Sequence, residues 1–162
     1  MELLLMRHAK SDWHQGVADF DRPLNDRGVE SAALMGKLLR EQDMLPNHII
    51  CSGAKRAQET ARGVVQAAEY VGDVTVSNRL YLCDLTDFIG VIRKYGGENN
   101  RLMVIAHNPG TEHFIAHLTG EHKRVTTGNI AKIELPLSVW ADFTPQTKGE
   151  LIGFWRPREP RS

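Results

Sequence analysis

Residues 1–11 read MELLLMRHAKS, an apolar run that ends at an arginine and a histidine. The four apolar residues at 3–6 are typical of a strand buried on both faces, as in a parallel sheet. Parallel sheets bind their ligands beyond the carboxyl ends of their strands. Arg7 and His8 would stand at that edge, which indicates an anion site with a nucleophile or a base. Taken alone, the pair could equally belong to an ordinary polar loop.

A second segment, at residues 48–60, reads HIICSGAKRAQET and repeats this organisation. The apolar residues 49–51 predict another short buried strand, and Ser52 and Gly53 favour a turn after it. The helical pattern that follows carries Arg56 near its start, where the free amide groups of the first turn favour an anion. This segment therefore predicts a second cationic group at the end of a strand.

Residues 102–110, LMVIAHNPG, follow the same scheme. The apolar run at 102–106 predicts a strand, and His107 comes directly after it. Three predicted strands thus each deliver a cationic or imidazole side chain to one sheet edge. Such an arrangement is common at one strand and not expected by chance at three, so we interpret this edge as the functional site.

The spacing of apolar residues in the rest of the chain alternates between helical and strand periods, which predicts an α/β fold. The first helix, which begins at Asp26, is expected to bury Val29, Ala32, Ala33, Gly36 and Leu39. Residues 14–26 are polar and are expected to form a loop near the site. Further helices are expected at 54–70, 87–95 and 110–119, and further strands at 74–77, 131–135 and 151–155.

The composition indicates a compact soluble enzyme. At 162 residues the chain suits a single domain, 1–162, with one sizeable core. The 20 basic and 20 acidic residues balance, so no overall field would attract nucleic acid or an anionic membrane. Cys51 and Cys83 are too few for a disulfide framework and are expected to be reduced. With no signal peptide and no apolar run of membrane-spanning length, cytoplasmic localisation is expected.

Four segments of the chain stand in a recognisable order: RHAKSDW (7–13), DRPLNDRG (21–28), CSGAKRAQET (51–60) and AHNPG (106–110). In this order and spacing they resemble the histidine phosphatase superfamily, and within it the SixA-like bacterial phosphohistidine phosphatases. The resemblance implies a phosphoglycerate mutase-like fold, which is a three-layer α/β sandwich with a mostly parallel central sheet and helices on both faces. It also implies a phosphatase that requires no metal and no other cofactor.

The resemblance assigns roles to the residues at the predicted edge. It implies that His8 is the nucleophile, which takes the phosphoryl group and later loses it to water. His107 would be the second histidine beside the phosphate. Arg7 and Arg56 suit a phosphate clamp, because a guanidinium stays charged and contacts two phosphate oxygens at once. These cations would also help to keep the His8 imidazole neutral and able to attack.

Two further residues are candidates for substrate binding. Arg22 lies in the DRPLNDRG segment and could reach the substrate, or it could be a surface arginine in a Pro-containing loop. Asn108 follows the second histidine and could contact the phosphate. The sequence leaves open whether Asn108, Lys10 or Ser11 does so.

A general acid for the leaving group is harder to assign. Relatives that act on phosphate esters carry an acidic residue between the second arginine and the second histidine. In the corresponding segment, RLYLCDLTDF at 79–88, the carboxylates are Asp84 and Asp87. Asp84 is a candidate acid, but both residues precede a helical pattern, and we favour an N-cap for Asp84 and a first-turn dipole partner for Asp87. A site without a dedicated acid suits a phosphoramidate, because an imidazole leaving group can be protonated without one.

The expected function is therefore a metal-independent phosphatase that forms a covalent intermediate at His8 and acts on phosphohistidine in a protein. The short segments between the predicted elements leave little chain for a lid, so a side chain of another protein could enter. One alternative is a phosphatase of small phosphomonoesters, or a phosphotransferase of the same superfamily. Another is a phosphate-binding module without catalysis, suggested by Ala9 and Lys10, since many relatives carry glycine after the Arg-His pair.

Two other groups of residues carry side chains that can bind a metal or act as a nucleophile. His113 and His117 share a helix face and, with His107, could suggest a metal site. Neither a paired glutamate nor a cysteine stands at ligand spacing around them, so no metal is expected. Ser52 lacks the nucleophile-elbow motif and is expected to cap the helix or to donate to phosphate.

Overall fold

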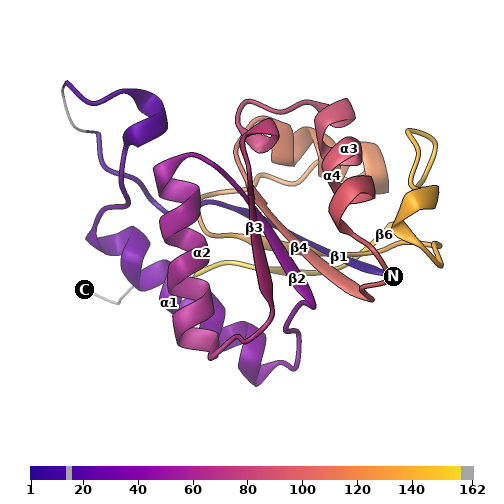
Figure 1. Cartoon of the computed structure of the whole chain (residues 1–162), viewed down its shortest axis with the longest axis horizontal. Coiled ribbons are helices and arrows are strands. Elements are labelled where there is room, and N and C mark those ends of the chain that lie inside the picture. The colour runs from indigo at the N-terminus through magenta and orange to yellow at the C-terminus, as the bar shows by residue number, and fades with distance from the viewer. Residues whose placement is uncertain (14–15, 158–162) are drawn as a thin grey trace.

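The computed structural model describes residues 1–13 and 16–157, and its centre is a six-stranded sheet (Figure 1). The strand order is β3-β2-β4-β1-β5-β6. The pairs β1–β4, β2–β4 and β2–β3 are parallel, whereas β5 runs antiparallel to β1 and β6. The mostly parallel sheet is therefore confirmed. The strands are β1 (Glu2–Arg7), β2 (His48–Ser52), β3 (Asp73–Ser77), β4 (Arg101–Ala106), β5 (Ile130–Glu134) and β6 (Glu150–Trp155).

Helices cover both faces of this sheet, which makes the predicted three layers (Figure 1). The helices α1 and α2 pack together on one face, and α3 and α4 cover the other. The bounds are α1 (Asp26–Glu41), α2 (Lys55–Ala68), α3 (Leu85–Tyr95) and α4 (Gly110–Thr119). Short 3-10 helices are η1 (Asp19–Asp21), η2 (Asn78–Leu80) and η3 (Trp140–Asp142).

The two-sided cover explains the unbroken apolar run in β1. Successive side chains of a strand point to opposite faces. Leu3 and Leu5 therefore pack with the core under α3 and α4, while Leu4 and Met6 pack with the core under α1 and α2. Both sets are buried because β1 lies in the interior of the sheet, between β4 and β5.

The buried face of α1 differs in part from the expectation. Val29 and Ala33 are exposed, although Ala32, Gly36 and Leu39 are buried as predicted. The reason is the close contact between α1 and α2: a Cβ on Gly36 would lie 2.5 Å from the carbonyl oxygen of a residue on α2. The contact turns the Gly36 side of α1 toward α2, and Val29 and Ala33 are therefore left exposed to solvent.

The predictions for the two cysteines and for the end of α4 are confirmed. Cys51 and Cys83 are free and buried, and burial raises the thiol pKa to about 11 and about 12. The helix α4 ends at Gly120, which adopts a left-handed conformation with φ of 74°. The predicted loop at 14–26 contains η1, and its first two residues lie outside the described part of the chain. No helix among the described residues is both long and apolar enough to span a bilayer.

Candidate active site

The three predicted strand ends meet at one edge of the sheet. The strands β2, β4 and β1 are neighbours and run parallel, so the residues after them come together. The ring centroids of His8 and His107 lie 5.1 Å apart, at an interplanar angle of 51°. Arg56, the second residue of α2, reaches His8 from the third strand end. All three side chains are buried, with relative exposures of 5 to 6%.

Hydrogen bonds determine which nitrogen of His8 can attack. The Nδ1 atom lies 2.7 Å from the carbonyl oxygen of Ala9, and a carbonyl only accepts, so Nδ1 carries the proton. Arg56 Nε donates to Nε2 at 3.4 Å, which requires a lone pair on Nε2. The pKa of His8 is lowered to about 3, chiefly by burial, and the nearby His107, Arg56 and Arg7 contribute in the same direction, against the hydrogen bond to the Ala9 carbonyl. His8 is thus a neutral imidazole at physiological pH, with Nε2 available as a nucleophile.

His107 is held from the end of β2. Its Nε2 lies 2.7 Å from Ser52 Oγ, which also accepts the N–H of Ala54 at 3.2 Å. Ser52 therefore orients the second histidine. It does not cap α2, whose N-cap residue is Ala54 and has no side-chain cap hydrogen bond. Donation from Ser52 to phosphate stays a prediction. Burial lowers the pKa of His107 to about 4, with a further contribution from Arg56. The rings of His107 and Tyr81 also meet in a T-shaped arrangement, with centroids 5.5 Å apart and an interplanar angle of 81°.

Asp19, in η1, joins two arginines at the mouth of the site. Arg56 Nη2 donates to Asp19 Oδ2 at 3.1 Å, and Arg56 Nη1 donates to the Asp19 carbonyl at 2.6 Å. Arg22 Nε donates to Asp19 Oδ1, also at 3.1 Å. The Tyr81 hydroxyl donates to the same carboxylate. These contacts, that of Tyr81 foremost, lower the pKa of Asp19 to about 2.

Arg22 belongs to this site and not to the surface. Its side chain is only 6% exposed, so the interpretation as a surface arginine is wrong. Besides Asp19, its guanidinium donates to Ser11 Oγ at 2.8 Å and to the Asp12 carbonyl at 3.2 Å. The Trp13 ring also packs on the Arg22 guanidinium, whose Cζ lies 3.7 Å from the ring centroid. Arg22 therefore supplies a third guanidinium at the edge where Arg7 and Arg56 were expected.

Arg7 is tied to the loop before β5. Arg7 Nη1 donates to the Val125 carbonyl at 3.0 Å, and Asn108 Nδ2 donates to the same oxygen at 2.8 Å. Glu112 Oε2 accepts the Val125 N–H at 2.7 Å. The Asn108 amide group therefore helps to fix the loop whose Val125 carbonyl positions Arg7. A direct contact of Asn108 with phosphate stays a prediction.

The structure gives Asp84 the capping role that the sequence favoured. Its Oδ1 accepts the Asp87 N–H at 3.0 Å, and Asp87 Oδ2 accepts the Asp84 N–H at 3.1 Å, which is a capping box at the start of α3. Arg79 Nε also donates to Asp87, at 3.1 Å. Both carboxylates are therefore engaged at the helix end.

Sequence reasoning missed three polar residues that hold this arrangement. Asp19 and Tyr81 come from segments far apart in the chain, and no local pattern connects them with the arginines. Thr60 accepts the Ala9 N–H at 3.0 Å and donates to the Arg56 carbonyl at 2.6 Å. Thr60 stands one helical turn after Arg56, and this spacing was the sequence feature that could have predicted its place near the site.

A metal site at the histidines has no support from the described residues. Among them, no group of three or more histidine, cysteine, aspartate or glutamate side chains could hold a metal ion. His113 is exposed, and His117 Nε2 donates to the Pro145 carbonyl at 2.7 Å. His107 lies beside His8 in the candidate active site.

Comparison with known proteins points to one family. The sequence profile of the histidine phosphatase superfamily (branch 1) matches residues 3–91. An uncharacterised protein of Mycobacterium tuberculosis is 33% identical to the chain, over 94% of this chain and 100% of its own length. A SixA protein of Nakamurella multipartitia shares the fold with a TM-score of 0.84 at 24% identity, covering 96% of this chain and 95% of that one. The protein histidine phosphatase SixA complexed with tungstate gives a TM-score of 0.81 at 23% identity, covering 97% of each chain.

Proposed function

This chain belongs to the histidine phosphatase superfamily (branch 1), and we propose that it removes phosphoryl groups from histidine residues of a partner protein through a phosphorylated His8. The chain is a hydrolase that acts on phosphoryl groups. The cytoplasmic location, the single domain and the absence of a cofactor stay predictions.

Binding of the substrate phosphoryl group is assigned to the guanidinium groups of Arg7, Arg22 and Arg56. A transferring phosphoryl group carries its charge on three equatorial oxygens, so fixed positive charges around it stabilise the transition state. Arg56 sits within the first turn of α2, where the helix dipole adds to its effect. Among the described residues, Arg7 has one hydrogen-bond acceptor, the Val125 carbonyl, which leaves donors on its guanidinium for an anion.

The first chemical step is attack by His8 Nε2 on phosphorus. The bond from phosphorus to the substrate nitrogen breaks, a bond from phosphorus to Nε2 forms, and the departing imidazole nitrogen takes up a proton. The observation that carries this step is the fixed Nδ1–H to Ala9 carbonyl bond, which keeps Nε2 as the attacking atom. In the second step water attacks phosphorus, the bond to Nε2 breaks, and inorganic phosphate leaves.

Phosphohistidine is favoured over an alkyl phosphate by the state of the carboxyl groups. Asp19 has a pKa of about 2, so it carries no proton to give at neutral pH. Asp84 and Asp87 cap α3, and Glu112 accepts a main-chain N–H. An alkoxide leaving group needs an acid, whereas an imidazole leaves as a neutral ring once it is protonated by solvent or a neighbouring group. The described site thus suits the easier leaving group.

The test compares two substrates without added metal. A peptide phosphorylated on histidine and an aryl phosphate are offered to wild type and to His8→Asn, and the wild-type enzyme is quenched in alkali for mass spectrometry of the peptide that contains His8. We expect faster phosphate release from the phosphohistidine peptide, loss of release in His8→Asn, and a phosphorylated His8. A preference for the aryl phosphate would indicate a small-ester phosphatase, and binding of phosphate without labelling of His8 would indicate a non-catalytic module.

A further inference from the structure

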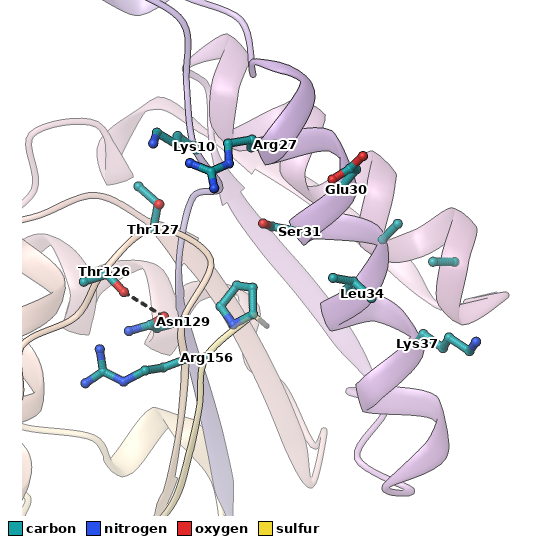
Figure 2. Close-up of a pocket in the computed structure, with 13 residues that line it drawn as sticks. Lys10, Arg27, Glu30, Ser31, Leu34, Lys37, Thr126, Thr127, Asn129 and Arg156 are labelled. Atoms are coloured by element: carbon teal, nitrogen blue, oxygen red, sulfur yellow. Dashed lines mark hydrogen bonds between the residues drawn. The ribbon is translucent and has the colours of Figure 1, made fainter. Parts of the chain in front are cut away.

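A groove of about 900 Å³ lies beside the proposed active site, between α1 and the chain around the start of β5 and the end of β6 (Figure 2). We call it the α1 groove. Arg27, Ser31 and Leu34 of α1 form one wall, and Thr127 and Arg156 lie on the opposite side (Figure 2). None of the residues that line it takes part in the chemistry proposed above.

The lining of the α1 groove combines positive charge with apolar surface. Leu34 contributes apolar surface and is 45% exposed. Cations outnumber carboxylates in the lining, although the acidic and basic residues of the whole chain balance at 20 each, so the excess is local. The charged residues of the lining are Lys10, Arg27, Lys37, Arg156 and Glu30.

The α1 groove is physically joined to the strand end that carries His8. Gly128, in the loop that forms part of the groove, donates its N–H to the carbonyls of Arg7 and His8, each at 3.0 Å. Lys10 lines the groove two residues after His8 and packs against the start of α1, where a Cβ on Gly28 would lie 2.0 Å from the Lys10 carbonyl oxygen. A polypeptide whose histidine enters the site would therefore have neighbouring residues close to this groove.

We infer that the α1 groove docks an acidic segment of the phosphorylated partner, next to its phosphohistidine. This inference rests on the proposed function, since it names the kind of protein that presents the substrate. Complementary charge determines partner choice and association rate at interfaces. The exposed Leu34 and the neighbouring alanines favour a polypeptide, which can place apolar side chains between acidic ones, over the uniformly charged backbone of a nucleic acid.

The experiment uses three substrates that carry the same phosphoryl group. The first is the small amide of phosphohistidine, the second a peptide in which glutamates and leucines flank phosphohistidine, and the third the same peptide with glutamine in place of glutamate. The groove variant combines Lys37→Glu with Arg156→Glu, both exposed and outside the proposed chemistry. The matched control combines Arg93→Glu with Lys94→Glu, two exposed cations of α3 on the other face of the sheet.

Wild type is expected to hydrolyse the acidic peptide with a kcat/KM about tenfold above that of the glutamine peptide at low salt, and the groove variant is expected to lose this preference. The difference should shrink at about 1 M salt, where charges are screened beyond about 3 Å. All variants should hydrolyse the small amide equally. An unchanged preference in the groove variant, or an equal loss in the control variant, would overturn the inference.

Failure of the proposed function is distinguishable from failure of docking. If none of the three substrates is hydrolysed, the proposed function fails, and docking is then decided by fluorescence anisotropy of the labelled, unphosphorylated acidic peptide. Binding by wild type that the groove variant loses would support the groove. Equal binding by both proteins, or displacement of the peptide by an equal concentration of oligothymidylate, would overturn the assignment to an acidic polypeptide.

Discussion

Replacing Asp19 by asparagine would test whether this carboxylate competes with the substrate phosphate. Its two oxygens accept from Arg22 and Arg56, the guanidinium groups that we assign to the phosphate. Asparagine has the same size and keeps one acceptor oxygen, so the change removes the negative charge and replaces the second acceptor with an NH2 group. We expect inorganic phosphate to bind more tightly to Asp19→Asn than to wild type.

The arginines should keep their places in this variant. Arg56 still donates to the main-chain carbonyl of residue 19, which lies 2.6 Å away in wild type. Arg22 still donates to Ser11 Oγ at 2.8 Å and to the Asp12 carbonyl at 3.2 Å. Because these contacts do not depend on the carboxylate, the loss of charge is expected to outweigh any loss of order.

The size of the effect follows from the exposure of the carboxylate. Two unit charges in contact near a protein surface interact by about 4 kcal/mol. The Asp19 side chain is 48% exposed, however, and solvent screening reduces the interaction energy of such an exposed charge to about 1 kcal/mol. A difference of about 1 kcal/mol corresponds to about fivefold in affinity.

The assay is the inhibition constant of inorganic phosphate against hydrolysis of a phosphohistidine peptide. The matched control is Asp21→Asn, which makes the same change at an exposed residue of the same short helix. Since the pKa of Asp19 is about 2, the difference between wild type and Asp19→Asn should persist from pH 8 down to about pH 4. Weaker phosphate inhibition in Asp19→Asn than in wild type would show instead that the carboxylate holds the arginines in place and does not compete with phosphate.

Three further predictions concern capping, positioning and pH. Asp84→Ala removes the cap of α3, so we expect the free energy of unfolding to fall by about 1 kcal/mol while turnover stays unchanged. A loss of turnover of about 100-fold or more would instead identify Asp84 as the general acid. Thr60→Val leaves the Ala9 N–H without its acceptor, so we expect the free energy of urea unfolding to fall by about 1–3 kcal/mol and kcat to decrease. Thr60→Ser should restore both, because serine keeps the hydroxyl. Normal activity in Thr60→Val would contradict a positioning role for Thr60. Burial lowers the pKa of His8 from its ordinary 6.5 to about 3, so the unfolded chain binds the extra proton and stability should fall as pH is lowered through this window. His8→Asn should reduce that slope in unfolding measured at pH 7, 5 and 4, and an unchanged slope would count against a buried neutral imidazole.

Local residue patterns were enough to predict the elements that carry Arg7, His8, Arg56 and His107. Each of these residues follows a short apolar run or begins a helix, and the side-chain pattern along a strand or helix is a local property of the chain. Parallel strands then bring their carboxyl ends to one edge whatever their order in the sheet. The α/β class and the strand ends at this edge could therefore be predicted without coordinates.

The other residues that contact these side chains could be identified only from the folded chain. Asp19 and Tyr81 are 62 positions apart, and their contact depends on how η1 folds over the sheet edge. The face that α1 buries was likewise determined by the contact of Gly36 with α2, since the apolar pattern also allowed Val29. Such contacts depend on packing between elements, which local residue patterns do not encode.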